Sequence, residues 1–163
     1  MFCLKISFVL FSIFQLTAAA TTCGDWEPYK NEYCFKVFPK LNSFADAQAL
    51  CKANDASSLA VIHYAEEQNF ISDFLFKHSK LVNSVWIGAK NTGANSYRWN
   101  DGSDMTVFSN WAPGHPLALP NYCVEMSPDV KSVGKLFCLK LTTLFHVALF
   151  FVRKVAQRTV PKE

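Results

Sequence analysis

Two stretches in the first half of the chain show the apolar spacing of amphipathic helices. The first starts at Ser43, which forms a capping-box pattern with Asp46 in place of the usual Glu, and is predicted to run through Ala53. The second is predicted over residues 65–77, with acidic residues in its first turn. Each presents one apolar face at spacings of three and four residues. The faces are formed by Phe44, Ala47, Leu50 and Cys51, and by Phe70, Ile71, Phe74 and Leu75.

Short apolar and aromatic segments between turn residues predict strands. One alternating segment lies at residues 33–38, and a short buried strand is predicted at 59–62. Beyond Leu81 the pattern changes to strands separated by turns rich in Asn, Gly and Pro. These later strands are predicted at residues 85–89, 97–99 and 122–126. Two helices followed by an antiparallel set of strands predict an α+β fold.

The N-terminus has the pattern of a secretory signal peptide. Lys5 precedes an apolar run from Ile6 to Leu16, and the small residues 17–20 form a cleavage site. The run is too short for a membrane-spanning helix. We therefore expect residues 1–20 to be a signal peptide and the mature chain to be secreted.

Composition limits the classes of protein to which the whole chain can belong. The 163 residues are 50% hydrophobic and 18% charged, which argues against disorder and allows one domain with at most a tail. The formal net charge is +3, and no stripe of Lys and Arg follows any segment. Nucleic acid is therefore not an expected partner.

The cysteines predict a disulfide framework in an oxidising compartment. Cys3 leaves with the signal peptide, and the others show no C-x-x-C spacing of the kind that binds zinc. A Cys23–Cys34 bridge would close a short hairpin and stabilise it by about 3 kcal/mol. The number of cysteines left is odd, so one thiol is free, pairs with another chain or lacks its partner.

Motifs for catalysis and for metal binding are missing from the sequence. It contains no G-x-S-x-G, no HExxH and no arrangement of Cys and His suited to nucleophilic catalysis. His63, His78, His115 and His146 have no metal-ligand spacing. We expect no enzymatic activity and no bound metal.

Four motifs in the second half of the chain carry a resemblance to a known family. They are Trp86-Ile87-Gly88-Ala89, Tyr97-Arg98-Trp99-Asn100-Asp101-Gly102-Ser103, Asn110-Trp111-Ala112-Pro113-Gly114-His115-Pro116 and Cys123-Val124-Glu125-Met126. In this order and spacing the chain resembles the long form of the C-type lectin-like domain. The resemblance covers about Cys23 to Gly134. It predicts a lectin-like domain at 21–135 and a divergent segment at 136–163.

The resemblance implies a secreted recognition module that binds a glycan or glycoprotein, typical of innate immunity. In sugar-binding members a Glu-Pro-Asn or Gln-Pro-Asp triplet binds calcium, whereas this chain has His115-Pro116-Leu117. Asn121 stands two residues before Cys123, where those members have an acid, and the later Trp-Asn-Asp motif is missing. Because calcium needs several charged oxygen ligands, no calcium cofactor is expected. The candidate ligand-binding residues are His115, Pro116, Leu117, Asn121 and Glu125, with Glu125 expected on a solvated strand face.

The resemblance also implies a cysteine pairing. Cys23 and Cys34 match the extra pair of the long form, and Cys138 would pair with Cys123. Where the family has its last cysteine, this chain has Phe151-Val152-Arg153, so Cys51 is expected to be buried and reduced. Losing a crosslink over about 100 residues forfeits about 4.7 kcal/mol in the chain-entropy model. In the alternative pairing, Cys138 bridges Cys51.

Two alternatives stay open from the sequence. Residues 136–152 are strongly apolar and are followed by Arg153 and Lys154, which would suit a membrane anchor, although Lys140 and the short length favour buried closing strands. The loop at 113–120 carries Leu117 and Leu119, whose apolar side chains suit a protein surface better than a sugar. A protein-binding lectin-like domain is therefore the second functional hypothesis.

Overall fold

The computed structural model describes residues 21–30, 32–54, 58–93, 96–118, 121–128, 134–140, 149–155 and 157–158. In 21–22, 137–140, 149–155 and 157–158 it describes the backbone alone. The expected signal peptide at 1–20 lies outside these residues, as do 141–148.

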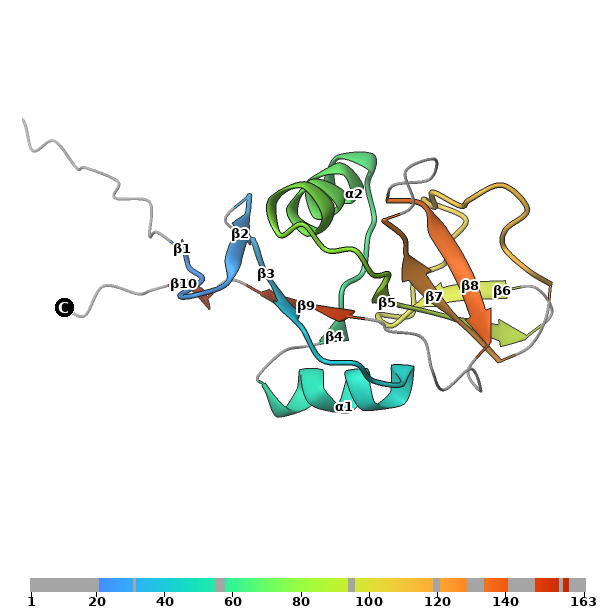
Figure 1. The fold of residues 1–163 in the computed structure, drawn as a ribbon, viewed down its shortest axis with the longest axis horizontal. Helices are drawn as coiled ribbons and strands as arrows, with labels where there is room; N and C mark the ends of the chain where they lie inside the picture. Colours follow the sequence, from blue (N-terminus) through green and yellow to red (C-terminus); the bar gives the residue numbers. More distant parts are fainter. Residues whose placement is uncertain are drawn as a thin grey trace, which may run out of the picture.

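One mixed sheet organises the chain (Figure 1). Its strand order is β2-β3-β9-β5-β7-β8, with β4 beside β9 and β6 beside β5. The strands are β2 (Glu27–Tyr29), β3 (Tyr33–Phe38), β4 (Ser58–Leu59), β5 (Val85–Gly93), β6 (Ser96–Trp99), β7 (Tyr122–Met126), β8 (Leu136–Lys140) and β9 (Leu149–Val155). Pairing is antiparallel except between β9 and β5. A separate pair joins β1 (Thr21–Thr22) to β10 (Gln157–Arg158).

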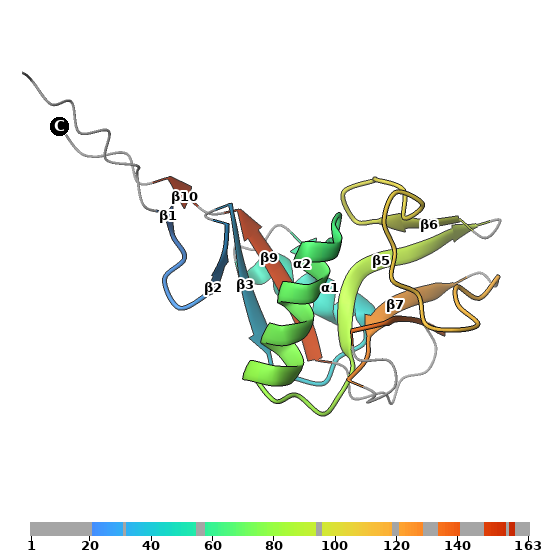
Figure 2. The same ribbon diagram turned by 90° about the horizontal axis from the view of Figure 1, so that it is seen from above.

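The helices lie on the two sides of β3 and β9 (Figures 1 and 2). Helix α1 (Phe44–Ala53) begins as predicted, with the Ser43 side chain accepting a hydrogen bond from the Asp46 backbone N–H at 3.1 Å. Helix α2 (Ala65–Ser72) continues into a π-helical segment, η1 (Asp73–His78). The predicted second helix is therefore present, but its last turns are wider than an α-helix. The Ser79 N–H bonds to the Phe74 carbonyl at 2.9 Å and closes this segment.

Two apolar clusters fill the space between these elements. The larger one joins α2 and η1 to the sheet, with Phe35, Ile71, Leu75 and Val124 fully buried. The smaller one joins α1 to the other side of the sheet. It consists of Phe44, Ala47, Cys51, Leu59, Trp86 and Cys123, with Trp26, Phe38 and Leu50 packed against it. Both predicted apolar helix faces are therefore core faces.

The predicted strand at 59–62 is the main local error. Only Ser58–Leu59 form a strand, β4, although residues 60–62 are fully or almost fully buried. The Ala60 carbonyl instead accepts a hydrogen bond from the Gly88 N–H of β5 at 2.7 Å. The apolar run at 59–62 therefore predicted the burial of these residues correctly. It did not predict their secondary structure, because the strand pairing ends at Leu59.

The C-terminal segment contributes strands to the same sheet. β8 pairs with β7, and β9 lies between β3 and β5. Among the described residues, no helix is long and apolar enough to cross a membrane. The domain boundary at residue 135 stays a prediction.

The cysteines agree with only part of the expected pairing. Cys23 and Cys34 form a disulfide with their Cα atoms 5.6 Å apart, and Cys51 is buried and free, both as expected. Cys123, however, is also a buried free thiol, so the expected Cys123–Cys138 bridge is wrong for this structure. The strand register explains the difference, because Leu139 pairs with Cys123 while Cys138 pairs with Val124. Burial raises the pKa of both free thiols to about 12, which keeps them protonated and unreactive at neutral pH.

Candidate functional site

A long loop at residues 100–121 connects β6 to β7 and carries most of the candidate residues. Two carboxylates hold its first turns: Asp101 accepts from the Ser103 N–H at 3.0 Å, and Asp104 accepts from the Thr106 N–H at 2.8 Å. The pKa of the Asp104 carboxyl is lowered by the Thr106 bonds. Partial burial opposes the shift at Asp101, but the bonds from Ser103 and the neighbouring His63 lower its pKa. Both acids therefore act as turn formers.

The second half of the long loop is attached to the sheet. The Ala112 N–H donates to the Leu136 carbonyl of β8 at 3.0 Å, and the Leu136 N–H donates to the Asn110 carbonyl at 2.9 Å. The Tyr97 hydroxyl of β6 donates to the Leu117 carbonyl at 3.1 Å. The peptide bond between His115 and Pro116 is cis. The three hydrogen bonds attach the long loop to β6 and β8.

A cavity of about 320 Å³ lies between β6 and the long loop. Its polar groups are hydroxyls and one carboxylate, and its apolar wall includes the half-buried Trp111, whose ring packs edge-on against Tyr97 at 5.2 Å. Hydroxyls and a carboxylate beside an indole ring can hydrogen-bond and stack against a polyhydroxylated ligand. The lining consists of Ser96, Tyr97, Asp104, Met105, Thr106, Ser109, Trp111 and Pro116. We call it the loop pocket.

The five candidate residues do not form one cluster. Pro116 is exposed and lines the loop pocket, and Asn121 is exposed with a positive φ of 63°. His115 is half-buried, which lowers the pKa of its imidazole and keeps it neutral at pH 7. Leu117 is also half-buried and packs against the larger apolar cluster instead of standing at an exposed loop tip. Leu119 lies outside the described residues.

The expectation for Glu125 is wrong. Its side chain is 7% exposed, and in β7 it pairs with Trp86 of β5 on one side and Phe137 of β8 on the other. Burial raises the pKa of this carboxyl to about 7, partly offset by a hydrogen bond with Ser84. Because residues 123–126 of β7 are all buried, both faces of this strand are covered, and alternation does not bring Glu125 to water. Glu125 is a core residue and not part of a solvent-accessible site.

The residues around the family's calcium position do not fit a calcium ion. His115 offers a neutral imidazole, and the Leu117 side chain is apolar and turned to the core. The oxygen donor left in the candidate set at the surface is the uncharged Asn121 side chain. Calcium takes six to eight oxygen ligands, typically with several carboxylates. Among the described residues no group of three His, Cys, Asp or Glu side chains could hold a metal ion.

Several pocket residues were not among the predicted candidates. Tyr97, Met105, Thr106 and Ser109 line the loop pocket beside Pro116. Their spacing follows no motif, because β6 and two separate parts of the long loop come together only in the fold. Tyr97 alternates with exposed Arg98 in β6, and this alternation was the one local signal that it faces inward.

Comparison with known proteins agrees with this geometry. A model for the lectin C-type domain matches residues 40–144. C-type lectin lectoxin-Lio1 of Erythrolamprus poecilogyrus is 34% identical over 114 residues, covering 68% of this chain and 69% of that protein. A C-type lectin galactose-binding isoform of Hoplocephalus stephensii is 35% identical over 123 residues, covering 69% of this chain and 74% of that protein.

The fold is also similar to a solved structure. A calcium-independent type II antifreeze protein superposes with a TM-score of 0.67 at 23% identity, covering 81% of this chain and 92% of that one. At this identity the likeness concerns the fold. With the family match over most of the described residues, it confirms the α+β architecture that the motifs predicted. The chain belongs to the C-type lectin domain family.

Proposed function

We propose that this protein is a secreted carbohydrate-binding module that binds its ligand in the loop pocket. The observation that carries the proposal is the lining of that pocket, where four hydroxyl residues and Asp104 stand beside the indole of Trp111. A galactose-binding isoform among the relatives supports a saccharide ligand. The Cys23–Cys34 disulfide supports secretion, because disulfides form in oxidising compartments. Membership of a family of binding proteins is consistent with the absence of enzymatic activity.

Removing hydroxyls from the loop pocket is expected to weaken glycan binding. In a glycan-array screen of residues 21–163, Thr106→Val with Ser109→Ala should lower the affinity for the best ligand about tenfold, because two neutral hydrogen bonds are lost. Ser79→Ala removes an exposed hydroxyl beyond η1 and is the control, with no expected effect. Equal binding by the two variants would contradict a saccharide in this pocket.

We further propose that recognition does not use calcium. Neither the neutral His115 nor the core-facing Leu117 can replace the carboxylate and amide oxygens of the family triplet. A ligand that binds only the folded state, at a hundredfold excess over its Kd, raises the free energy of unfolding by about 2.7 kcal/mol. In a domain of this size this raises the melting temperature by several degrees. The melting temperature is therefore expected to be the same in millimolar calcium and in excess chelator.

A second variant tests whether the altered triplet alone accounts for the expected lack of calcium binding. His115→Glu with Leu117→Asn restores the two oxygen side chains, and His115→Gln is the control for the loss of the imidazole. Because no Trp-Asn-Asp segment supplies the remaining ligands, the double variant is also expected to show no calcium-dependent melting. A clear rise in melting temperature with calcium in the unmodified chain would refute the proposal.

A protein ligand is the second candidate function. Val107 in the long loop is 82% exposed and lies in the sequence between the pocket residues Thr106 and Ser109, and an exposed apolar side chain there suits a protein surface better than a purely polar ligand. The structural likeness to a calcium-independent antifreeze protein shows that this fold is found in a protein whose name does not refer to sugar. Failure of every glycan on the array to bind the folded chain would favour this alternative.

A further inference from the structure

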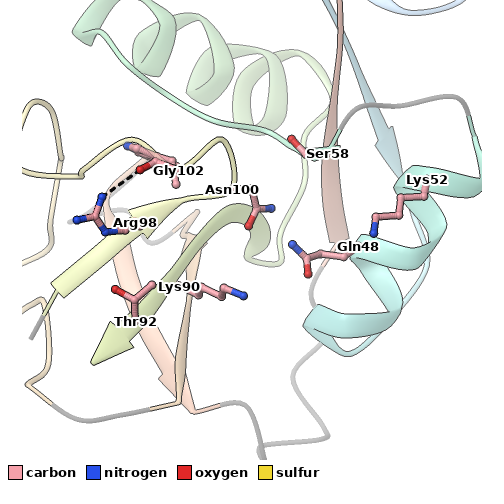
Figure 3. A pocket seen from close by; sticks show the side chains of 9 residues that line it. Gln48, Lys52, Ser58, Lys90, Thr92, Arg98, Asn100 and Gly102 are labelled. Atoms are coloured by element: carbon pink, nitrogen blue, oxygen red, sulfur yellow. Dashed lines mark hydrogen bonds between the residues drawn. The ribbon is translucent and has the colours of Figure 1, made fainter. Parts of the chain in front are cut away.

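A second cavity, of about 390 Å³, lies between α1, β4, β5 and β6 (Figure 3). It does not include the candidate residues of the long-loop triplet. Three cationic side chains line it, Lys52 from α1, Lys90 from β5 and Arg98 from β6. Its other polar lining comes mainly from Gln48, Ser58 and Asn100. We call it the cationic pocket.

The charge in the cationic pocket is not neutralised by its own lining, which contains no acidic residue among those described. Arg98 is partly compensated, because its Nη1 donates to the Gly102 carbonyl at 3.1 Å and its Nη2 lies 3.9 Å from the Asp104 carboxylate. Among the described residues, Lys52 and Lys90 have no ion-pair partner. Figure 3 shows these lysines approaching the same space from α1 and from β5. Repulsion between them would be relieved by a bound anion.

Asn100 provides an independent indication of a ligand. Its backbone N–H donates to the Gly88 carbonyl at 2.7 Å, which fixes this lining residue of the pocket beside β5. Its side-chain Nδ2 is buried and has no hydrogen-bond partner in the described structure. Gly88 makes room for this amide, since a Cβ at position 88 would lie 3.0 Å from Nδ2. A buried N–H without an acceptor is unfavourable, so a turn of the Asn100 amide toward the cavity, where an oxygen of a ligand could accept from it, would satisfy this donor.

We propose that the cationic pocket binds a saccharide that carries a negatively charged group, such as a sulfate or a carboxylate. The lysines attract the anionic group, and the Asn100 amide donates to one of its oxygens or to a sugar oxygen. Gln48 and Ser58 offer both donors and acceptors for sugar hydroxyls. The volume is in the range of small-molecule sites. The saccharide part of this inference rests on the proposed function, whereas the anion part rests on the charges alone.

Binding is tested on the full mature chain by calorimetry at low ionic strength with galactose 6-sulfate, galacturonic acid, galactose and inorganic sulfate. Galactose 6-sulfate should bind at least about tenfold more tightly than galactose, and added salt should weaken it. Lys52→Gln with Lys90→Gln should lower its affinity at least about tenfold. Lys77→Gln in η1 is the control, since it removes an exposed charge that pairs with Asp73 at 2.7 Å. Galacturonic acid distinguishes a carboxylate from a sulfate as the preferred group.

A second variant keeps the test valid if the lysine variant folds poorly. Asn100→Asp preserves the shape of the side chain, replaces the buried donor by a carboxylate and should also abolish binding of the sulfated sugar. Equal affinity of the unmodified chain and these variants would overturn the proposal. Inorganic sulfate binding as tightly as galactose 6-sulfate would overturn its saccharide part.

The two proposed sites can fail separately. Thr106→Val with Ser109→Ala alters the loop pocket and should leave the binding of galactose 6-sulfate unchanged. If neutral glycans fail to bind while the lysine-dependent binding of the sulfated sugar persists, the loop-pocket proposal is wrong and the cationic pocket stands. If neutral glycans bind while the sulfated sugar shows no lysine-dependent binding, the proposal for the cationic pocket is wrong and that for the loop pocket stands.

Discussion

Glu125→Gln is expected to stabilise the protein above pH 7 and to remove much of the pH dependence of its stability between pH 5 and pH 8. Burial raises the pKa of the Glu125 carboxyl from 4.5 to about 7 in the folded state. Between these two values the folded chain holds a proton that the unfolded chain has lost. The favourable contribution is therefore complete below pH 4.5 and is lost as the pH rises through 7.

The size of this effect follows from the pKa difference. A difference of this size corresponds to about 3 kcal/mol in the free energy of unfolding. Urea unfolding of both proteins at intervals from pH 4 to pH 8 measures it, with nearly equal stability expected at pH 4. Ser84→Ala should have the opposite effect and make stability depend more strongly on pH. Losing the hydrogen bond from Ser84 raises the pKa of the Glu125 carboxyl further. Parallel pH profiles for the parent and Glu125→Gln would show that Glu125 is ionised and solvated in the fold.

Trp86→Ala is expected to destabilise the protein by about 3–5 kcal/mol, a large part of the stability of a typical domain. Trp86 is 4% exposed and packs edge-on against Phe44 of α1, with ring centroids 5.7 Å apart. Its indole N–H also donates to the Asn42 carbonyl at 3.1 Å, just before α1. The residue therefore holds α1 against the sheet, and with it one wall of the cationic pocket.

Two further variants separate the contributions of Trp86. Trp86→Phe keeps much of the apolar contact but removes the hydrogen bond to Asn42, so a smaller loss of about 1–2 kcal/mol is expected. Trp26→Ala is the matched control, because Trp26 is half-buried and packs at the edge of the same cluster. Chemical denaturation of the three variants gives the ranking. If Trp26→Ala were as destabilising as Trp86→Ala, α1 would not depend on the Trp86 anchor.

Regular elements with a strong local signal could be predicted from the sequence. The first helix was predicted correctly because the Ser43 cap and the apolar spacing of Phe44, Ala47 and Cys51 act within a few residues of one another. The strands at 33–38 and 122–126 were also correct to the residue. The ordered motifs around Trp86, Trp99 and Trp111 identified the family, although in the fold Trp86 joins the smaller apolar cluster and the other two belong to or pack against the larger one.

The site was less predictable because it depends on pairings between distant segments. Alternation along β7 could not reveal that both faces of this strand are buried, since the neighbours of Glu125 come from the distant strands β5 and β8. The pairing of Cys123 depends on the register between β7 and β8, and a shift of one residue changes which side chains can meet.

By itself, the sequence determined the α+β fold, the cap and bounds of the first helix, the apolar faces and the loss of oxygen ligands at His115 and Leu117, since each is a property of residue type and local spacing. Only the tertiary structure decided which side chains share a pocket. Lys52, Lys90 and Arg98 come from α1, β5 and β6, and no periodicity in the chain relates them. They meet because α1 packs on the sheet through Trp86. Contacts between segments so far apart in the chain cannot be predicted from the local pattern of apolar and polar residues.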